Sequence, residues 1–262
     1  MKGKRIMQHV YRIKAAICIM AASLLLTHCE KDPGPGVYEV NGQKWESPDV
    51  LIHDAVTDID GNVYDAVKIG SQTWMAQNLR VIRYADGTSV LDVPYATYFV
   101  PSIEVKYGYL YNWQAVMRNA TSSTSDPSGV QGLCPDGWHM PSESEWIQLT
   151  DYVSRQNQYT CGDGESDEIA KALADTAGWR SDGNIQSPGC YPHCNNITGF
   201  SAFPTGNQDT ATEGKMACFW SATESGTSNS ASGVALYYNK AHVTFSNFSK
   251  EDRMAIRCVK NY

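Results

Sequence analysis

The sequence predicts an α+β domain in which helices precede an antiparallel sheet. Two segments with helical periodicity, residues 143–157 and 166–177, lie in the middle of the chain. Short β-prone segments separated by turn residues fill the last quarter, an order typical of α+β folds. Six cysteines follow residue 29, and an even number in an exported chain indicates a disulfide-stabilised domain.

The first 28 residues are similar to an export signal. Basic residues precede an apolar run, residues 15–26, that is too short to span a bilayer. The run ends at Leu26-Thr-His-Cys29, which resembles the cleavage motif of bacterial lipoproteins, although His28 stands where a small residue is usual. We therefore expect residues 1–28 to be removed and Cys29 to carry the lipid. The alternative is an ordinary signal peptide with a chance cysteine.

Charge limits the partners of the exported part. Residues 1–28 hold five of the 21 Lys and Arg residues and none of the 28 Asp and Glu residues, so the remainder has a net charge of −12. Such an acidic chain is a poor ligand for nucleic acid, which requires a basic surface. No later apolar segment is long enough to cross a membrane, so we expect membrane contact through the lipid anchor only. Glu30-Lys-Asp32 resembles the sorting signals of surface-exposed outer-membrane lipoproteins.

The segment after the signal divides into a tether and a domain. Residues 29–55 are a tether with a short hairpin, residues 37–45, around Asn41-Gly42. The domain is expected over residues 56–262. It opens with Asp58-Ile-Asp-Gly-Asn-Val-Tyr64, which is typical of a tight turn. A calcium loop is the alternative, but Thr73 stands at the twelfth position, where such a loop needs Glu.

The first half of the domain contains short β-prone segments and one long loop. Residues 67–75 read as two strands around a Gly-Ser turn, and the aromatic segment 107–113 is also β-prone. Residues 120–132 are rich in Ser, Thr, Pro and Gly, which predicts an exposed loop.

A helix begins directly after the motif at residues 134–141. Ser142 and Glu145 form a capping box, which predicts a helix over residues 143–157 with Trp146 facing inward. The second helix is expected from its N-cap Ser166 to Gly178. Strands are then expected at residues 199–203, 219–223, 233–238, 241–245 and 254–260.

Several motifs occur in order along residues 56–260. They are Asp58-Ile-Asp-Gly-Asn-Val-Tyr64, residues 67–79, Tyr107-Gly-Tyr-Leu-Tyr-Asn-Trp113, Cys134-Pro-Asp-Gly-Trp-His-Met-Pro141, Gly199-Phe-Ser-Ala202, Trp220-Ser-Ala-Thr-Glu224 and Ile256-Arg-Cys-Val259. Together they resemble one family, the Fibrobacter succinogenes major paralogous domain, which is found in exported proteins and lipoproteins of bacteria. The resemblance implies a C-type-lectin-like fold, in which a cysteine before the first long helix pairs with one in the last strand, positions that Cys134 and Cys258 occupy.

The pairing of the other four cysteines stays open at this stage. We favour a local Cys190–Cys194 bond and a Cys161–Cys218 bond. A zinc site at Cys190-Tyr-Pro-His-Cys194 is the alternative, but no second CxxC motif accompanies it and the compartment is oxidising.

We expect a non-catalytic surface module that binds an extracellular glycan or protein. In the last three predicted strands Val234 and Leu236, Val243 and Phe245, and Ile256 and Cys258 alternate as inward residues. The polar and aromatic residues between them suit adaptable recognition, unless they are merely solvated. The ligand contacts are expected at Tyr237, Asn239, His242, Thr244, Ser246, Asn247 and Phe248.

An enzyme and a calcium lectin are the competing interpretations. Residues 137–146 resemble a motif of the formylglycine-generating, sulfatase-modifying enzymes, but residues 219–257 lack the cysteine pair that those enzymes place before the last strand. No Gly-x-Ser-x-Gly motif occurs, and we expect His139 to be structural. We predict no cofactor except a structural calcium ion, for which Asn207, Asp209 and Glu213 are weak candidates.

Overall fold

The structure is a computed structural model, and the chain divides into two units, Met1–Glu46 and Ser47–Tyr262. The described residues are 37–40, 43–46, 50–92, 98–99, 107–156, 167–207, 210–226 and 229–262. Of the first unit, the structure describes the predicted hairpin, in which strand β1 (Val37–Val40) pairs antiparallel with β2 (Gln43–Glu46). The predicted signal peptide and Cys29 lie outside the described residues.

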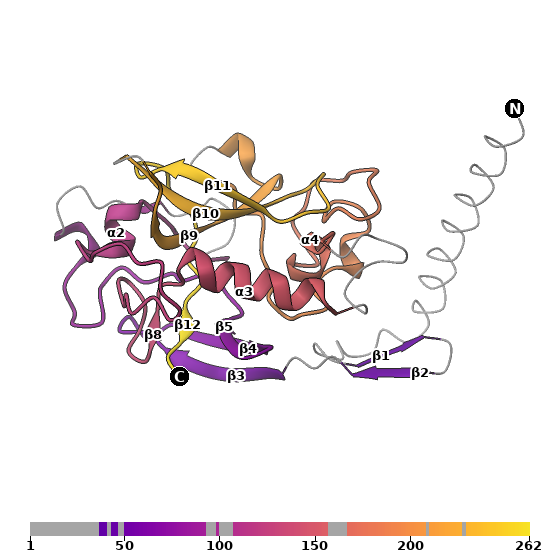
Figure 1. Ribbon diagram of the computed structural model, residues 1–262, viewed down its shortest axis with the longest axis horizontal. Coiled ribbons are helices and arrows are strands. Elements are labelled where there is room, and N and C mark those ends of the chain that lie inside the picture. The colour runs from indigo at the N-terminus through magenta and orange to yellow at the C-terminus, as the bar shows by residue number, and fades with distance from the viewer. Residues whose placement is uncertain are drawn as a thin grey trace, which may run out of the picture. The chain divides into compact units, whose positions relative to one another are not determined.

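The second unit combines antiparallel sheets with helices, so the predicted α+β class is confirmed. A five-stranded sheet has the order β3-β4-β5-β12-β8, and a three-stranded sheet has the order β11-β10-β9. Figure 1 shows helix α3 lying between the two sheets, with contacts to β4, β9 and β10. The strands are β3 (Val50–Thr57), β4 (Val63–Ile69), β5 (Gln72–Met75), β8 (Trp138–His139), β9 (Met216–Glu224), β10 (Ser230–Tyr237), β11 (Thr244–Ser249) and β12 (Val259–Lys260).

Minor elements connect these sheets. A two-stranded ladder joins β6 (Tyr98–Phe99) to β7 (Leu110–Tyr111), and helix α2 spans Trp113–Met117. Short 3-10 turns are η1 (Val90–Asp92), η4 (Pro192–Cys194) and η5 (Thr210–Thr212).

Helix α3 (Glu143–Ser154) forms as the sequence predicts. The Ser142 hydroxyl accepts a hydrogen bond from the Glu145 backbone N–H, and the Glu145 carboxylate accepts one from the Ser142 backbone N–H. Trp146, Leu149 and Val153 are buried on its inward face. The ring centroids of Trp146 and Trp74 lie 4.5 Å apart, so α3 packs on the five-stranded sheet through an aromatic contact.

The second helix is much shorter than predicted. Helix α4 spans only Ala170–Leu173, because Ala174 is extended and bridges Ala202. The Asp175 N–H then donates to the Ala202 carbonyl at 2.9 Å, a bond that a continued helix would not make. This single bridge also replaces the strand predicted at residues 199–203.

The end of the chain joins a different sheet from the one predicted. We expected residues 254–260 to extend the meander beside β10 and β11. Instead β12 is short and pairs with β5 and β8 in the five-stranded sheet. Ile256 and Cys258 are still buried, as expected, but they lie just before β12, in a hydrophobic cluster that also contains Ala66 and Met75 of the five-stranded sheet.

Arg257, which lies between Ile256 and Cys258, is also fully buried. Its guanidinium donates to the Asn78 side-chain oxygen at 2.7 Å and to the carbonyls of Met75, Phe200 and Ser201. The guanidinium carbon also lies 4.6 Å from the centroid of the Phe200 ring. One side chain therefore satisfies acceptors from two separate segments, residues 75–78 and 200–201, and ties both to the chain just before β12.

Candidate functional site

The predicted ligand residues gather at one edge of the three-stranded sheet. We call the set Tyr237, Asn239, His242, Thr244, Ser246, Asn247 and Phe248 the β11 surface. Its outermost strand, β11, pairs with β10 alone among the described strands. Asn239, His242, Ser246 and Asn247 are exposed, whereas Tyr237, Thr244 and Phe248 are half-buried.

The register of this hairpin is the one expected. Val234 is paired with Phe245, and both side chains face the same hydrophobic cluster. Leu236 and Val243 contact that cluster too. The alternation of apolar and polar residues in the sequence therefore predicted correctly that these four side chains face the core.

The expectation of an open sheet face is wrong. The opposite face of β10, with Ala231 and Ala235, is buried against a second hydrophobic cluster, and Tyr237 and Phe248 pack partly against it. Asn247 and Phe248 lie within β11 on opposite faces of the strand, not at turns. Only the edge strand and the turn before it reach solvent, because both faces of β10 are covered.

Phe248 packs against a core aromatic residue, so only part of its ring is available to a ligand. Its ring lies edge-on to Trp220 at 6.2 Å. A side chain held in this way is a rigid contact for a partner, but it also supports the core.

The cysteines confirm one predicted pairing and correct two. A disulfide joins Cys134 to Cys258, as predicted. Cys190 is buried, Cys194 is the exposed last residue of η4, and no disulfide joins them, so the Cys190–Cys194 prediction is wrong. Cys218 has a free thiol inside the core, so its predicted bond to Cys161 is wrong too; Cys161 itself lies outside the described residues. Burial raises the pKa of the Cys218 thiol, which keeps it protonated.

The candidate calcium residues are used within their own loops. The Thr212 hydroxyl donates to the Asn207 side-chain oxygen at 2.8 Å, which closes a turn, while Asp209 lies outside the described residues. The Asp58 carboxylate is the centre of the predicted tight turn and accepts bonds from Asn62 and the Tyr64 hydroxyl. Within the described ranges no three His, Cys, Asp or Glu residues cluster as a metal site, and Glu213 joins no such group.

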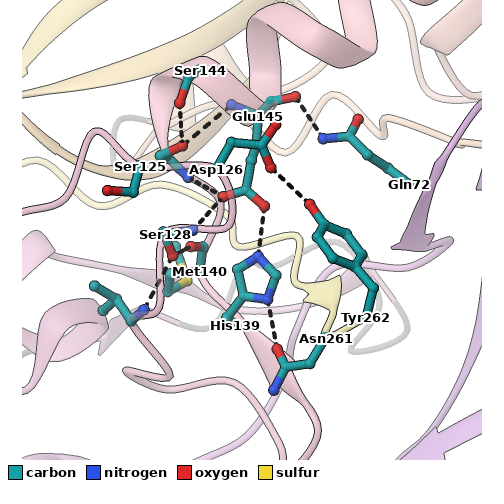
Figure 2. Close-up of polar contacts among 12 residues, drawn as sticks. Gln72, Ser125, Asp126, Ser128, His139, Met140, Ser144, Glu145, Asn261 and Tyr262 are labelled. Carbon is teal, nitrogen blue, oxygen red and sulfur yellow. Dashed lines mark hydrogen bonds and ion pairs between the residues drawn. The ribbon is translucent and has the colours of Figure 1, made fainter.

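A buried polar network lies beneath the loop that precedes α3 (Figure 2). His139 Nε2 lies 2.6 Å from Glu145 Oε1, and its Nδ1 lies 2.7 Å from Asn261 Oδ1. The other Glu145 oxygen accepts from the Ser128 backbone N–H at 3.0 Å. At the exposed edge of this network the Tyr262 hydroxyl donates to Asp126 at 2.7 Å. The network fastens the loop and the chain end to α3, which fits the structural role expected of His139.

Opposing effects act on the charge of His139. Burial acts to lower its pKa, but the hydrogen bond and the negative charge of Glu145 outweigh burial, and Asn261 and Asp126 add to them. The pKa of His139 is therefore raised above its ordinary value. The protonated ring donates from both nitrogens, which suits the two oxygens that face it.

This raised pKa predicts how stability depends on pH. The stabilisation from His139 should be complete below its ordinary pKa, about 6.5, and should be lost as pH rises through the raised value. Urea unfolding of the wild type should show a falling free energy of unfolding across that window, and His139→Gln should lack this slope. A matched His53→Gln variant, at a side chain that is 75% exposed, should keep it. Equal slopes in wild type and His139→Gln would contradict the assignment.

The structure adds a hollow that the sequence did not reveal. It has a volume of about 540 Å³ and lies between residues 117–123 and 128–132. We expected an exposed loop there. The run Thr121-Ser-Ser-Thr-Ser125 was the available signal, but composition alone does not show that a loop folds around a concavity.

Comparison with known proteins yields one match. The family model described as the Fibrobacter succinogenes major domain matches residues 67–260. No curated protein and no solved structure matches the chain. In the part of the chain that the structure describes, no helix combines the length and apolarity needed to cross a bilayer.

Proposed function

The chain belongs to the Fibrobacter succinogenes major domain family, and from this premise we propose that it is a non-catalytic module that binds an extracellular ligand at the cell surface. The ligand is a glycan or a protein. The observation that carries the proposal is the β11 surface, where exposed Ser246 lies on the same face of an edge strand as the half-buried ring of Phe248, and exposed Asn247 lies on the other face. Adaptable polar groups next to a rigid aromatic ring are typical of recognition surfaces.

The proposed fold type is C-type-lectin-like. Its support is the disulfide, which joins a cysteine just before α3 to one just before the last strand β12. The long helix between two antiparallel sheets also agrees with it (Figure 1). Superposition of an experimental structure on known members of that fold tests this proposal.

An array of glycans and extracellular proteins, probed with the purified protein, tests the function. We expect binding to at least one ligand, and we expect the affinity to persist in EDTA. Turnover of a substrate without retained binding would support the enzyme alternative. Loss of binding in EDTA that calcium restores would support a calcium lectin instead.

The proposed place of display is the outer face of the outer membrane, reached through a lipid on Cys29. A Cys29→Ala variant should shift from the membrane fraction to the soluble fraction, because the acyl chains supply the membrane affinity. Labelled palmitate should enter the wild type and not the variant. If the wild type takes up no label, the anchor proposal is wrong. Protease shaving of intact cells distinguishes surface display from an inward-facing anchor.

A further inference from the structure

The hollow between residues 117–123 and 128–132 has the size and the chemistry of a small-ligand site. At about 540 Å³ it lies within the range of about 300–1,000 Å³ that is typical of ligand pockets. Its side chains include the hydroxyls of Thr121, Ser122 and Ser123. It is open to solvent and none of the residues given for its lining belongs to the β11 surface, so it is a different site from the one to which the proposed function refers.

The hydroxyl groups retain hydrogen-bonding capacity for a ligand. Ser122 Oγ accepts from the Glu224 backbone N–H at 2.8 Å, and Ser123 Oγ accepts from the Ser125 N–H at 3.2 Å. A hydroxyl that accepts still has its own hydrogen to donate. Within the described residues the Thr121 hydroxyl has no partner, so it can both donate and accept.

The charge in the hollow is already neutralised. Arg118 is the charged residue of the lining, and its guanidinium donates to Asp86 at 2.7 Å and lies over the Tyr84 ring. The hydrogen bond from Arg118, aided by Thr88, lowers the pKa of Asp86 to about 2, so this pair stays ionised at neutral pH. Among the described residues that line the hollow, none is acidic. A neutral ligand rich in hydroxyl groups matches this lining better than an anion or a metal ion.

The walls of the hollow are fixed before any ligand arrives. Ser128 is buried, its N–H donates to Glu145, and its hydroxyl donates to the Met140 carbonyl. Gly132 has a positive φ, and a Cβ there would lie 2.2 Å from the Val116 carbonyl oxygen, so the two walls are in direct contact. Preorganised polar groups lose little conformational freedom on binding.

We propose that this hollow binds a neutral saccharide unit through the hydroxyls of Thr121, Ser122 and Ser123. Thr121 is exposed, so Thr121→Trp should fill the hollow without removing a contact of the fold. Thr124→Trp is the matched control, because Thr124 is exposed on the same loop but does not line the hollow.

The test uses NMR titration of the ¹⁵N-labelled protein with glucose, galactose, mannose and N-acetylglucosamine at millimolar concentrations, with sulfate as an anion probe. At least one sugar should shift the amide signals of residues 121–123 and 129–132. Thr121→Trp should weaken that binding about tenfold or more, the effect of losing a central contact, while Thr124→Trp should not. The proposal is overturned if no sugar shifts these signals, if sulfate alone does, or if Thr121→Trp binds as the wild type. A Ser246→Arg variant should leave the titration unchanged, so this test is independent of the β11 surface.

Discussion

Arg257→Met should cost about 4 kcal/mol or more and unfold much of the protein at modest denaturant. The guanidinium serves acceptors on Asn78, Met75, Phe200 and Ser201, and a buried acceptor left without a donor costs about 1–3 kcal/mol. Methionine fills a similar volume but donates nothing. Exchange of a whole buried ion pair for apolar residues is often tolerated, but here the partners are three backbone carbonyls and the Asn78 amide oxygen, which all stay polar.

The measurement is urea unfolding at pH 7, where the guanidinium is charged even though burial lowers the pKa of Arg257 to about 9. Arg155→Met is the matched control at a side chain that is 77% exposed, and it should change the free energy of unfolding by no more than about 0.5 kcal/mol. Arg257→Lys should fall between the two, because an ammonium group cannot reach all four acceptors. Equal midpoints for the two methionine variants would contradict the role of Arg257 in joining the segments.

Removal of the Cys134–Cys258 bond should cost about 5 kcal/mol. The two cysteines are 124 residues apart, and in the chain-entropy model a cross-link over such a loop restricts the unfolded chain by about that amount. The Cys134→Ala/Cys258→Ala double variant should therefore unfold at much lower urea than the oxidised wild type. Alanine is preferred to serine because both positions are fully buried.

Reductant supplies the control for this prediction. Dithiothreitol should lower the midpoint of the wild type toward that of the double variant and should leave the double variant unchanged. If the reduced and oxidised wild types unfold at the same midpoint, the bond does not form or does not stabilise the domain. Peptide mapping under non-reducing conditions separates these two cases.

Local signals in the sequence predicted local structure well. The Ser142–Glu145 capping box, the turn around Asp58 and the pairing of β1 with β2 each join residues that are close together in the sequence. The inward orientation of Val234 and Phe245 followed from simple alternation. The Cys134–Cys258 bond followed from the family resemblance, which located both cysteines in a fold.

Long-range pairing could not be predicted in the same way. Residues 166–177 have helical periodicity, but the bridge between Ala174 and Ala202 ends the helix after one turn. Residues 254–260 look like a strand, but nothing local shows that Val259 pairs with Trp74 rather than with the preceding hairpin. In both cases a partner far along the chain competes with local propensity.

In the candidate site, too, local features were predictable from the sequence and long-range packing was not. Alternation identified the polar residues of β11, but it could not show that the second face of β10 is covered as well. One wall of the hollow beside Thr121 includes Ser128, whose backbone N–H is held by Glu145 of the distant helix α3. A concavity made by several segments leaves no periodic signal in any one of them.

The most direct test of the account is a binding titration of the β11 surface. With a ligand from the array, the double variant Ser246→Arg/Asn247→Arg should bind at least about tenfold more weakly than the wild type, because two exposed contacts become large and charged. Its free energy of unfolding should stay within about 0.5 kcal/mol of the wild-type value, since both side chains are exposed. Thr57→Arg, at an exposed position on the edge strand of the other sheet, is the control and should bind as the wild type. Equal affinities for the wild type, the double variant and the control would contradict recognition through β11.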